Sequence, residues 1–408
     1  MKRKILKIVL GLITKGIIKK YNPKIIGVTG SVGKTSTKNT IFLYLNSFFN
    51  TRKNIGNLNT EFGVPLVFIG KEKGGGNSII GWIKIILLGI KLLFIKDNNY
   101  PEIVVVEMGA DKPGDISYLT KIAKPNISVV TLIGETPVHL ENYNNINDLI
   151  LEKSEIVKVL GENDYSVLNF DDSYVRLMKE KTKSKVIYFG ASEASDIKFF
   201  DLKYNYINEE PRGISFKVEY NSIVKEVILP FCYSNSFGYS IVSAIACGII
   251  LGINFEYLKP EIFKNLKPEK GRMNLIKSKK GFFIIDDTYN SSPASAKMAI
   301  DSMSKLKAQK RIIALGDMKE LGQKSDQAHQ EIGEIVFGLA DFLITVGESS
   351  KKISEKSIDL GFNKNNAFHF NNSEEAIDTI NNIIGAGDLL LVKGSRSMKM
   401  EKIIEKLI

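Results

Sequence analysis

The sequence predicts an α/β protein made of two units, each built around a largely parallel β-sheet. Its 408 residues exceed what a single hydrophobic core ordinarily serves. Short apolar bursts alternate with helical patterns almost throughout, which is typical of parallel strands covered by helices. The segment "LKPEKGRMN", rich in lysine, glycine and proline, interrupts this alternation, so we place a hinge near residue 269.

Residues 1–22 are expected to form a basic amphipathic helix. Their run "MKRKILKIVLGLITKGIIKKY" starts like a signal peptide, but lysines interrupt it and no A-x-A-like cleavage site follows. Its apolar positions share one helical face, which suits docking either on the protein or on a membrane. Segment 70–100 contains a similar stretch, whose Lys84 and Lys91 count against a membrane-spanning helix. We therefore expect 1–22 and 70–100 to contact a membrane surface or a protein partner.

Residues 23–268 are expected to form the central unit. Its early strands are "KIIGVT", "EIVVVEM" and "ISVVTL". The stretch "GISFKVEYNSIVKEVILPF" alternates polar and apolar residues around an Asn-Ser turn, which predicts an antiparallel hairpin, and the helix "SIVSAIACGIILGI" follows. Residues 269–408 then repeat an α/β pattern, with strands in "GFFIIDD", "KRIIALG", "DFLITVG", "NAFHF" and "DLLLVKG".

The composition limits the class of partner. With 56 basic and 45 acidic residues, the net charge of +11 suits nucleotides, sugar phosphates or a membrane surface. Nucleic acid is not expected, because no basic–aromatic stripe or zinc-ligand spacing occurs. The two cysteines, Cys232 and Cys247, form no disulfide framework. We therefore expect a cytoplasmic protein, with the inner face of the membrane as an alternative location.

The stretch "GVTGSVGKTS" predicts a phosphate-binding loop. A strand runs into Gly30, and Gly33, Lys34 and Thr35 open a helix whose N-terminus favours anions. Lys34 would neutralise the β- and γ-phosphates, and the Thr35 hydroxyl would bind Mg²⁺. The strict G-x-x-x-x-G-K-[ST] pattern fails because residue 28 is valine. A chance glycine turn is the alternative, and the order of strand, loop and helix counts against it.

Three further side chains are candidates for the same site. Glu107 ends a predicted parallel strand, where it could hold the magnesium ion that Thr35 touches or could simply be solvated. His139 follows the next strand and would emerge on the same edge, although a capped loop histidine is the ordinary interpretation. Lys153 lies on a predicted helix, where a solvated surface charge is the ordinary interpretation.

A series of sequence blocks resembles the Mur ligase family. The blocks run in the family's order from about residue 22 to the C-terminus: "GVTGSVGKTSTK", "NIGNLNTEFGVPL", "VVEMGADKPGDISYL", "PNISVVTLIGETPVHLENYNNINDLILEKSEIV", "VLNFDD", "KGRMN", "FIIDDTYNSSPASAKMAI", "ALGDMKELGQKSDQAHQEIG" and "LLLVKGSRSMKMEKII". The D-D-x-Y-N-x-x-P and G-D-M-x-E-L-G blocks together are most similar to the member that adds D-alanyl-D-alanine.

The resemblance implies a central P-loop ATPase domain with a parallel sheet and a C-terminal Rossmann-like α/β domain. It implies ATP-dependent amide formation in peptidoglycan precursor synthesis: a carboxylate of a nucleotide-sugar peptide takes the γ-phosphoryl group, and an amine then displaces phosphate from the acyl phosphate. The substrates would be a UDP-N-acetylmuramoyl-tripeptide and D-alanyl-D-alanine.

The resemblance also assigns roles to single residues. Lys153 matches a lysine carbamylated by CO₂, and Arg272 matches an arginine that reaches the γ-phosphate when the C-terminal domain closes. Two Mg²⁺ ions would be held by Thr35, Glu107, His139 and Lys153. Catalysis would depend on Lys34, His139, Lys153 and Arg272. ATP would contact Gly30, Ser31, Val32, Gly33, Lys34, Thr35, Ser36, Arg272, Asp287 and Asn290. The other substrates would contact Asn59, Thr60, Asp317, Glu320, Leu321, Lys393, Ser395 and Arg396.

Two departures from the family pattern change what we expect. Where the family has an "H-N-x-x-N-A" helix near the nucleotide base, this chain has Tyr239, Ser240 and Ser243. The family also carries an N-terminal domain for the uridine nucleotide, whereas about 22 residues precede the first strand here. We therefore expect uridine-nucleotide recognition to be reduced or rebuilt, with segments 1–22 and 70–100 as the unassigned material.

Two other functions remain open. One is a Mur-type ligase that acts on a different carboxylate, such as a glutamate- or folate-linked acid. The other is a P-loop nucleotide switch without ligase activity. The pairing of His139 with Lys153 favours a ligase, because a switch needs only one metal ion.

Overall fold

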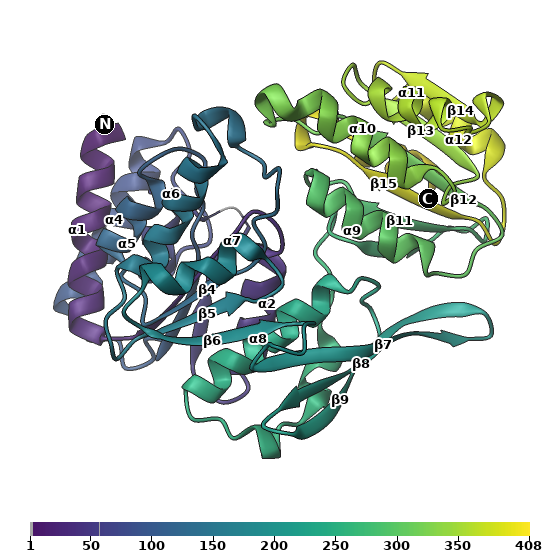
Figure 1. Ribbon diagram of the computed structural model, residues 1–408. Helices are drawn as coiled ribbons and strands as arrows, with labels where there is room; N and C mark the ends of the chain where they lie inside the picture. Colours follow the sequence, from purple (N-terminus) through teal and green to yellow (C-terminus); the bar gives the residue numbers. More distant parts are fainter. Residues whose placement is uncertain (1–2, 57) are drawn as a thin grey trace.

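The protein, described by a computed structural model over residues 3–56 and 58–408, contains two sheets with helices on their faces (Figure 1). The first sheet has the strand order β2-β3-β1-β4-β5-β6-β7-β8-β9, and the second has the order β10-β11-β15-β12-β13-β14. The predicted α/β class is confirmed. The strands of the first sheet end at Leu229 and those of the second begin at Asn274, while a domain boundary between 268 and 269 stays a prediction.

The first sheet is parallel from β2 to β7 and antiparallel from β7 to β9. Its strands are β1 (Lys24–Thr29), β2 (Thr51–Lys53), β3 (Ile103–Glu107), β4 (Ile127–Val130), β5 (Tyr165–Asn169), β6 (Lys185–Gly190), β7 (Ile197–Ile207), β8 (Glu210–Tyr220) and β9 (Ile223–Leu229). The predicted hairpin is present as β8 and β9. Its turn residues Asn221 and Ser222 have φ of 49° and 63°, which suits a tight two-residue turn between twisted strands. The strands β2, β5, β6 and β7 of this sheet were not predicted.

The second sheet contains all five predicted strands and one that was not predicted. Its strands are β10 (Asn274–Lys277), β11 (Phe283–Asp287), β12 (Arg311–Gly316), β13 (Phe342–Val346), β14 (Ala367–Phe370) and β15 (Leu389–Lys393). The additional strand, β10, pairs antiparallel with β11 at the edge of the sheet. The other neighbours pair in parallel.

Alternate side chains of the parallel strands point to opposite faces of the sheet and pack in two hydrophobic layers. Val105 of β3 belongs to the layer shared with α2 and α8, whereas its neighbours Val104 and Val106 belong to the layer under α1, α3, α4, α5 and α6. The helices of this unit are α1 (Arg3–Tyr21), α2 (Lys34–Leu45), α3 (Gly63–Ile69), α4 (Ile79–Phe94), α5 (Asp115–Ile122), α6 (Ile146–Lys158), α7 (Ser173–Arg176) and α8 (Ser236–Ile250). Those of the second unit are α9 (Pro293–Ser304), α10 (Ser325–Val336), α11 (Lys351–Asp359), α12 (Ala376–Ile383) and α13 (Glu401–Leu407).

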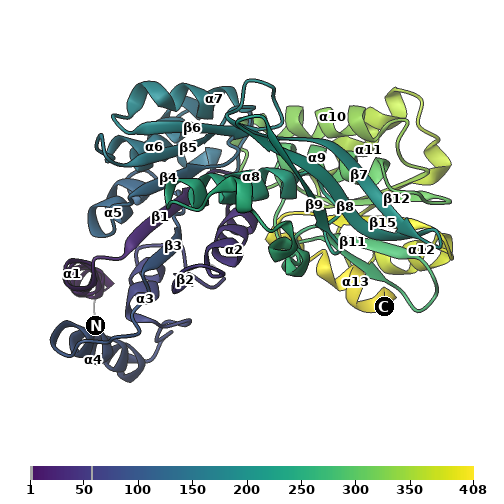
Figure 2. The same ribbon diagram turned by 90° about the horizontal axis from the view of Figure 1, so that it is seen from below.

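The N-terminal helix α1 packs on the first unit beside α4, at the edge farthest from the second sheet (Figures 1 and 2). Its Leu10 and Ile17 are completely buried, while Ile8 and Leu12 on the other side face solvent. In residues 3–56 and 58–408, no helix combines the length and apolarity that crossing a membrane requires.

Candidate active site

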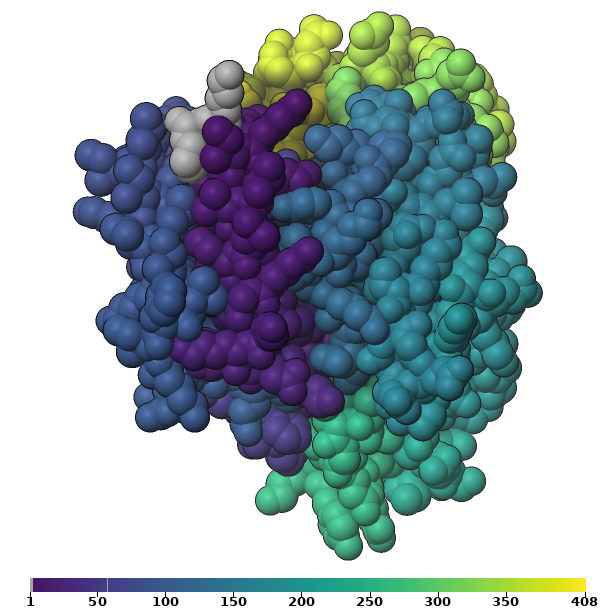
Figure 3. All heavy atoms as spheres, turned by 90° about the vertical axis from the view of Figure 1, so that its left-hand side faces the viewer, coloured from purple at the N-terminus to yellow at the C-terminus, as the bar shows by residue number. Residues whose placement is uncertain are grey.

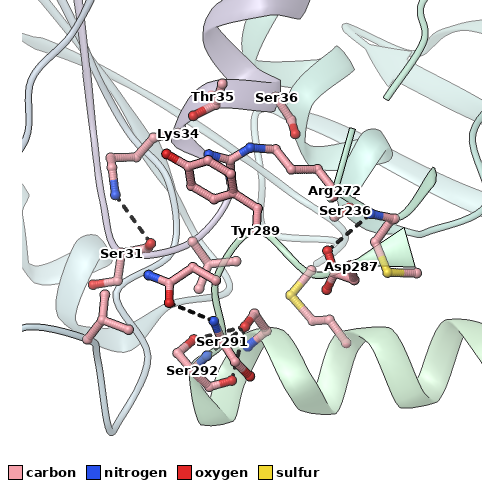
Figure 4. Close-up of a pocket in the computed structure, with 18 of the residues that line it drawn as sticks. Ser31, Lys34, Thr35, Ser36, Ser236, Arg272, Asp287, Tyr289, Ser291 and Ser292 are labelled. Atoms are coloured by element: carbon pink, nitrogen blue, oxygen red, sulfur yellow. Dashed lines mark hydrogen bonds between the residues drawn. The ribbon is translucent and has the colours of Figure 1, made fainter. Parts of the chain in front are cut away.

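A cavity of about 450 Å³ lies between the two units. The first unit contributes the loop after β1, the end of β3 and the loops that follow β3 and β4. The second contributes residues that follow β11, and the connection at Gly271 and Arg272 closes the cavity. In Figure 4, Lys34 and Thr35 face Arg272, Tyr289 and Ser291 across this space. The carboxyl ends of parallel strands are where open α/β sheets bind ligands.

The loop after β1 is shaped by two glycines. Gly30 has φ of 141°, and a Cβ atom there would lie 2.0 Å from the Thr131 hydroxyl oxygen, so only glycine fits. Gly33, with φ of 85°, precedes Lys34, the first residue of α2. The Lys34 ammonium donates to the Gly30 carbonyl oxygen at 3.0 Å, and burial lowers its pKa. A positive charge is thus held at the N-terminus of a helix, where phosphate binds well.

Glu107, the last residue of β3, has a carboxylate that is fully engaged by the first unit. Its Oε2 atom accepts from the Thr35 hydroxyl at 2.8 Å, and its Oε1 atom accepts from the Asn59 amide at 3.1 Å. Its backbone N–H donates to the Asn54 side chain at 2.9 Å. The site therefore presents a carboxylate and a hydroxyl side by side, the kind of oxygen donors that Mg²⁺ prefers.

Lys153 reaches the same loop from α6. Its ammonium donates to the Gly30 carbonyl oxygen at 3.0 Å, so one carbonyl receives both Lys34 and Lys153. The side chain is buried, and this burial, together with the nearby charge of Lys34, lowers the pKa of Lys153 to about 7. Its amine is therefore far more often neutral, and more nucleophilic, than that of an ordinary lysine.

His139 links the two units. It follows β4 with φ of 67°, and its Nδ1 atom lies 2.6 Å from Oε2 of Glu320, which follows β12 in the second unit. Its Nε2 atom lies 3.4 Å from Oδ1 of Asp111. The hydrogen bond from His139 lowers the pKa of Glu320.

The second unit contributes a group of charged and aromatic residues. The Arg272 guanidinium lies over the Tyr289 ring, 3.8 Å from its centroid. Lys393, at the end of β15, donates to Oδ2 of Asp287 at 2.5 Å and to the Asn290 carbonyl oxygen at 2.9 Å. The other oxygen of Asp287 accepts from the Met273 N–H at 3.0 Å, so this carboxylate ties the connection between the units to the second sheet.

The predicted substrate-contact residues divide into two groups. Asn59, Thr60 and Lys393 line the cavity, and Glu320 reaches its rim through His139. The other four occupy structural positions outside the lining: the Asp317 carboxylate accepts from the Ser350 N–H, the Ser395 hydroxyl accepts from the Lys319 N–H, Leu321 is buried in the core, and Arg396 pairs with Glu401 on the surface.

A second cavity of about 220 Å³ adjoins the other side of the phosphate loop, beside Val32 and Gly33. Tyr239 lines it and donates to Oδ2 of Asp171 at 2.9 Å. Asn235 also lines it, and its buried side-chain oxygen has no hydrogen-bond partner among residues 3–56 and 58–408. Ser240 lines this cavity, whereas the Ser243 hydroxyl donates to a helix carbonyl instead.

Three residues of this cavity were not predicted from the sequence: Asn169, Asp171 and Asn235. Asn169 ends β5, and the strand-end argument that identified Glu107 would also have identified it. Asp171 lies two residues further along the same loop. Asn235 precedes α8, and the packing of α8 against α2, the helix that follows the phosphate loop, brings it to the cavity.

The described part of the chain holds no cluster of three or more His, Cys, Asp or Glu side chains that could form a metal site unaided. A metal ion here would therefore need other donors as well. Mg²⁺ commonly takes only one or two carboxylates and completes its shell with water and substrate phosphates. The Glu107 and Thr35 pair fits that kind of site.

Comparison with known proteins gives one consistent result. Residues 84–232 match the description "Mur ligase middle domain", and residues 271–396 match "Mur ligase, glutamate ligase domain". The chain is 30% identical over 409 residues to the UDP-N-acetylmuramoyl-tripeptide–D-alanyl-D-alanine ligase of Buchnera aphidicola, covering 98% of this chain and 80% of that protein. The Bacillus subtilis enzyme of the same name is 28% identical over 398 residues, covering 97% and 78% of the two chains.

A solved structure shares the fold. The MurF ligase of Thermotoga maritima, crystallised in complex with ADP, has a TM-score of 0.81 and 26% identity. The similarity covers 98% of this chain and 83% of that chain.

Proposed function

The chain belongs to the Mur ligase family, and we propose that it is an ATP-dependent ligase that joins D-alanyl-D-alanine to UDP-N-acetylmuramoyl-tripeptide. The observation that carries this proposal is the shared contact of Lys34 and Lys153 with the Gly30 carbonyl oxygen. A buried second lysine at the phosphate loop has no evident use in a simple nucleotide switch. It fits a site that must bring a substrate carboxylate up to a triphosphate.

ATP is proposed to lie along the phosphate loop. Its phosphates would meet Lys34 and the N–H groups that open α2, and its base would enter the second cavity. Asn235 supports this placement, because its unpartnered oxygen could accept from the amino group of adenine. This contact would stand in for the asparagines of the family helix, which Ser240 and Ser243 replace. Asp287 and Asn290, together with Lys393, would form the side of the site that faces the second unit.

Thr35 and Glu107 would hold one Mg²⁺ ion, and His139 and a carbamate on Lys153 would hold a second. Such ions would offset the charge of the phosphates and the substrate carboxylate. His139 would bind this ion through Nε2, while its Nδ1 atom would keep its contact with Glu320. The oxygen pair of Thr35 and Glu107 supports the first site.

The carbamate is proposed from the environment of Lys153. The neutral amine would attack the carbon of CO₂, an N–C bond would form as one C=O π bond opens, and one N–H proton would leave to solvent, so that a neutral amine becomes an anionic carbamate. A pKa lowered to about 7 supports this step, because only the unprotonated amine can react.

The reaction would proceed in two steps. An oxygen of the tripeptide carboxylate attacks the γ-phosphorus of ATP, the bond to the bridging oxygen breaks, and ADP leaves with that oxygen. The amine of D-alanyl-D-alanine then attacks the acyl carbon, phosphate leaves with the carboxylate oxygen, and the new amide nitrogen loses a proton. The Arg272 guanidinium would stabilise the negative charge of the transferred phosphoryl group. Asn59 and Thr60 would line the path of the carboxylate substrate.

Release of ADP tests this function against its alternatives. With ATP and Mg²⁺ present, we expect ADP only when both UDP-N-acetylmuramoyl-tripeptide and D-alanyl-D-alanine are added. A nucleotide switch would release ADP without either. A Mur-type ligase for another carboxylate would release it with a glutamate- or folate-linked acid instead. We propose the cytoplasm as the location, where ATP and such precursors occur together.

A further inference from the structure

The helices α1 and α4 present an exposed apolar surface that the proposed reaction does not use. On α4, the residues Ile79, Ile80, Ile83, Leu87, Ile90 and Phe94 are exposed, and Phe94 reaches 82%. At 3.6 residues per turn these positions fall in a stripe about 100° wide. Only Ile85 and Gly89 of α4 are buried, and they lie on the opposite side of the helix. An apolar stripe this long is uncommon on the surface of a soluble protein.

The two helices form one surface. Gly89 of α4 lies against Ile13 of α1, and Gly16 of α1 lies against Leu93 of α4. The Lys20 ammonium caps the end of α4 by donating to the carbonyl oxygens of Leu92 and Leu93 at 2.9 and 3.1 Å. Figure 3 looks onto α1 with the segment that contains α4 beside it. The exposed Ile5, Ile8 and Leu12 of α1 extend the apolar area.

The charge on this surface has a single sign. Neither helix contains an acidic residue. Their basic residues are Arg3, Lys4, Lys7, Lys15, Lys19, Lys20, Lys84 and Lys91. On α4, Lys84 and Lys91 are exposed along one edge of the apolar stripe. Basic side chains beside a stripe of Ile, Leu and Phe are typical of helices that lie in the surface of an anionic bilayer.

The surface is connected directly to the substrate side of the cavity. Asn59 and Thr60 line the cavity, and Phe62 follows them two residues later. The Phe62 ring lies 6.2 Å from the ring of Trp82 on α4, and the Arg3 guanidinium of α1 lies 5.7 Å from the same Phe62 ring. The beginnings of both helices therefore border the loop that lines the cavity.

We propose that α1 and α4 dock this protein on the surface of a membrane that contains anionic lipids. The apolar stripe would enter the boundary between headgroups and acyl chains, and the lysines would meet the lipid phosphates. A second copy of the chain would bind this surface less well than an anionic membrane, because it would bring the same positive charge against it. Docking would hold the mouth of the cavity beside the bilayer without any segment crossing it.

Flotation with lipid vesicles tests this proposal on the full chain. We expect binding to vesicles of phosphatidylcholine with phosphatidylglycerol, and at least tenfold weaker binding to phosphatidylcholine alone. The variant Ile83→Glu/Leu87→Glu/Phe94→Glu changes exposed side chains only, and its binding should fall at least tenfold. Lys84→Gln/Lys91→Gln should weaken binding on the order of tenfold, on anionic vesicles only. Trp82 is the chain's one tryptophan, so its fluorescence reports the titration from α4 itself.

The matched control is Leu177→Glu/Tyr257→Glu/Leu360→Glu, which adds the same charge at exposed positions on other elements. It should bind vesicles nearly as the unaltered protein does. All variants should keep the ATP-dependent activity with soluble substrates, so loss of docking is distinguishable from loss of the proposed function. The proposal is overturned if the unaltered protein does not float with anionic vesicles, or if the α4 variant binds like the control. It is also overturned if light scattering shows a dimer that the α4 variant dissociates.

Discussion

His139 of the first unit and Glu320 of the second are in contact at the rim of the cavity, with Nδ1 and Oε2 2.6 Å apart. The two residues are 181 positions apart in the chain, and neither lies within a strand or a helix. The pair is partly exposed, with side-chain exposures of 23% and 39%, so its contribution to stability is about 1 kcal/mol or less. Its importance is therefore expected in catalysis, where it fixes a histidine at the junction of the two units.

Substitution of Glu320 tests that expectation. In Glu320→Gln the carboxylate charge that holds His139 is lost, and we expect kcat to fall about tenfold or more while Tm changes by only about 2 °C. Glu141→Gln, which removes an exposed carboxylate beside His139, is the matched control and should be nearly neutral. Equal kcat values for the two variants would show that Glu320 has no part in catalysis.

Lys34→Ala is expected to abolish ligation and leave the fold intact. Removing its ammonium leaves the β- and γ-phosphates without their nearest cation, a loss on the order of a thousandfold in kcat/KM. Circular dichroism should be unchanged, and the exposed Lys183→Ala should keep full activity. Turnover near normal in Lys34→Ala would contradict the phosphate-loop assignment.

Lys153→Ala should be nearly inactive, and short carboxylic acids such as formate should restore part of its activity by replacing the carbamate. Lys158 is an exposed lysine of the same helix, so Lys158→Ala is the control and should keep its ligase activity without added carboxylic acid. Full activity of Lys153→Ala would exclude the carbamate.

The pKa of Lys153 also predicts a pH dependence. Since burial lowers this pKa to about 7, the amine is neutral above that pH and protonated below it. CO₂ reacts only with the neutral amine, so activity at fixed dissolved CO₂ should decline as the pH falls through about 7. Removal of CO₂ should slow the unaltered enzyme at every pH. An activity that is indifferent to CO₂ would contradict this mechanism.

Arg272→Ala should lower kcat far more than it raises KM for ATP. The guanidinium is held over the Tyr289 ring at the connection between the units, where closure would carry it to the transferred group. The exposed neighbour Lys270 provides the control as Lys270→Ala. A variant that loses ATP affinity but keeps kcat would assign Arg272 to binding alone.

Local patterns predicted much of this protein and left specific parts unpredicted. The phosphate loop was readable because strand, glycines and helix lie within a dozen residues, and the hairpin because Asn221 and Ser222 suit its turn. The strand β10 was missed because its four residues lie at a sheet edge and carry little alternation. The His139–Glu320 pair depends on how two sheets pack, which no local pattern encodes. Asn235 is placed in its cavity by the packing of α8.

The most direct test of the central claim follows oxygen from one substrate to another. The tripeptide is labelled with ¹⁸O in its reacting carboxylate and incubated with ATP, Mg²⁺ and D-alanyl-D-alanine. If an acyl phosphate forms, mass spectrometry will find one ¹⁸O atom in the released inorganic phosphate and one in the new amide. Release of ADP with unlabelled phosphate would show that water attacks the nucleotide, and would contradict the assignment of this site to amide ligation.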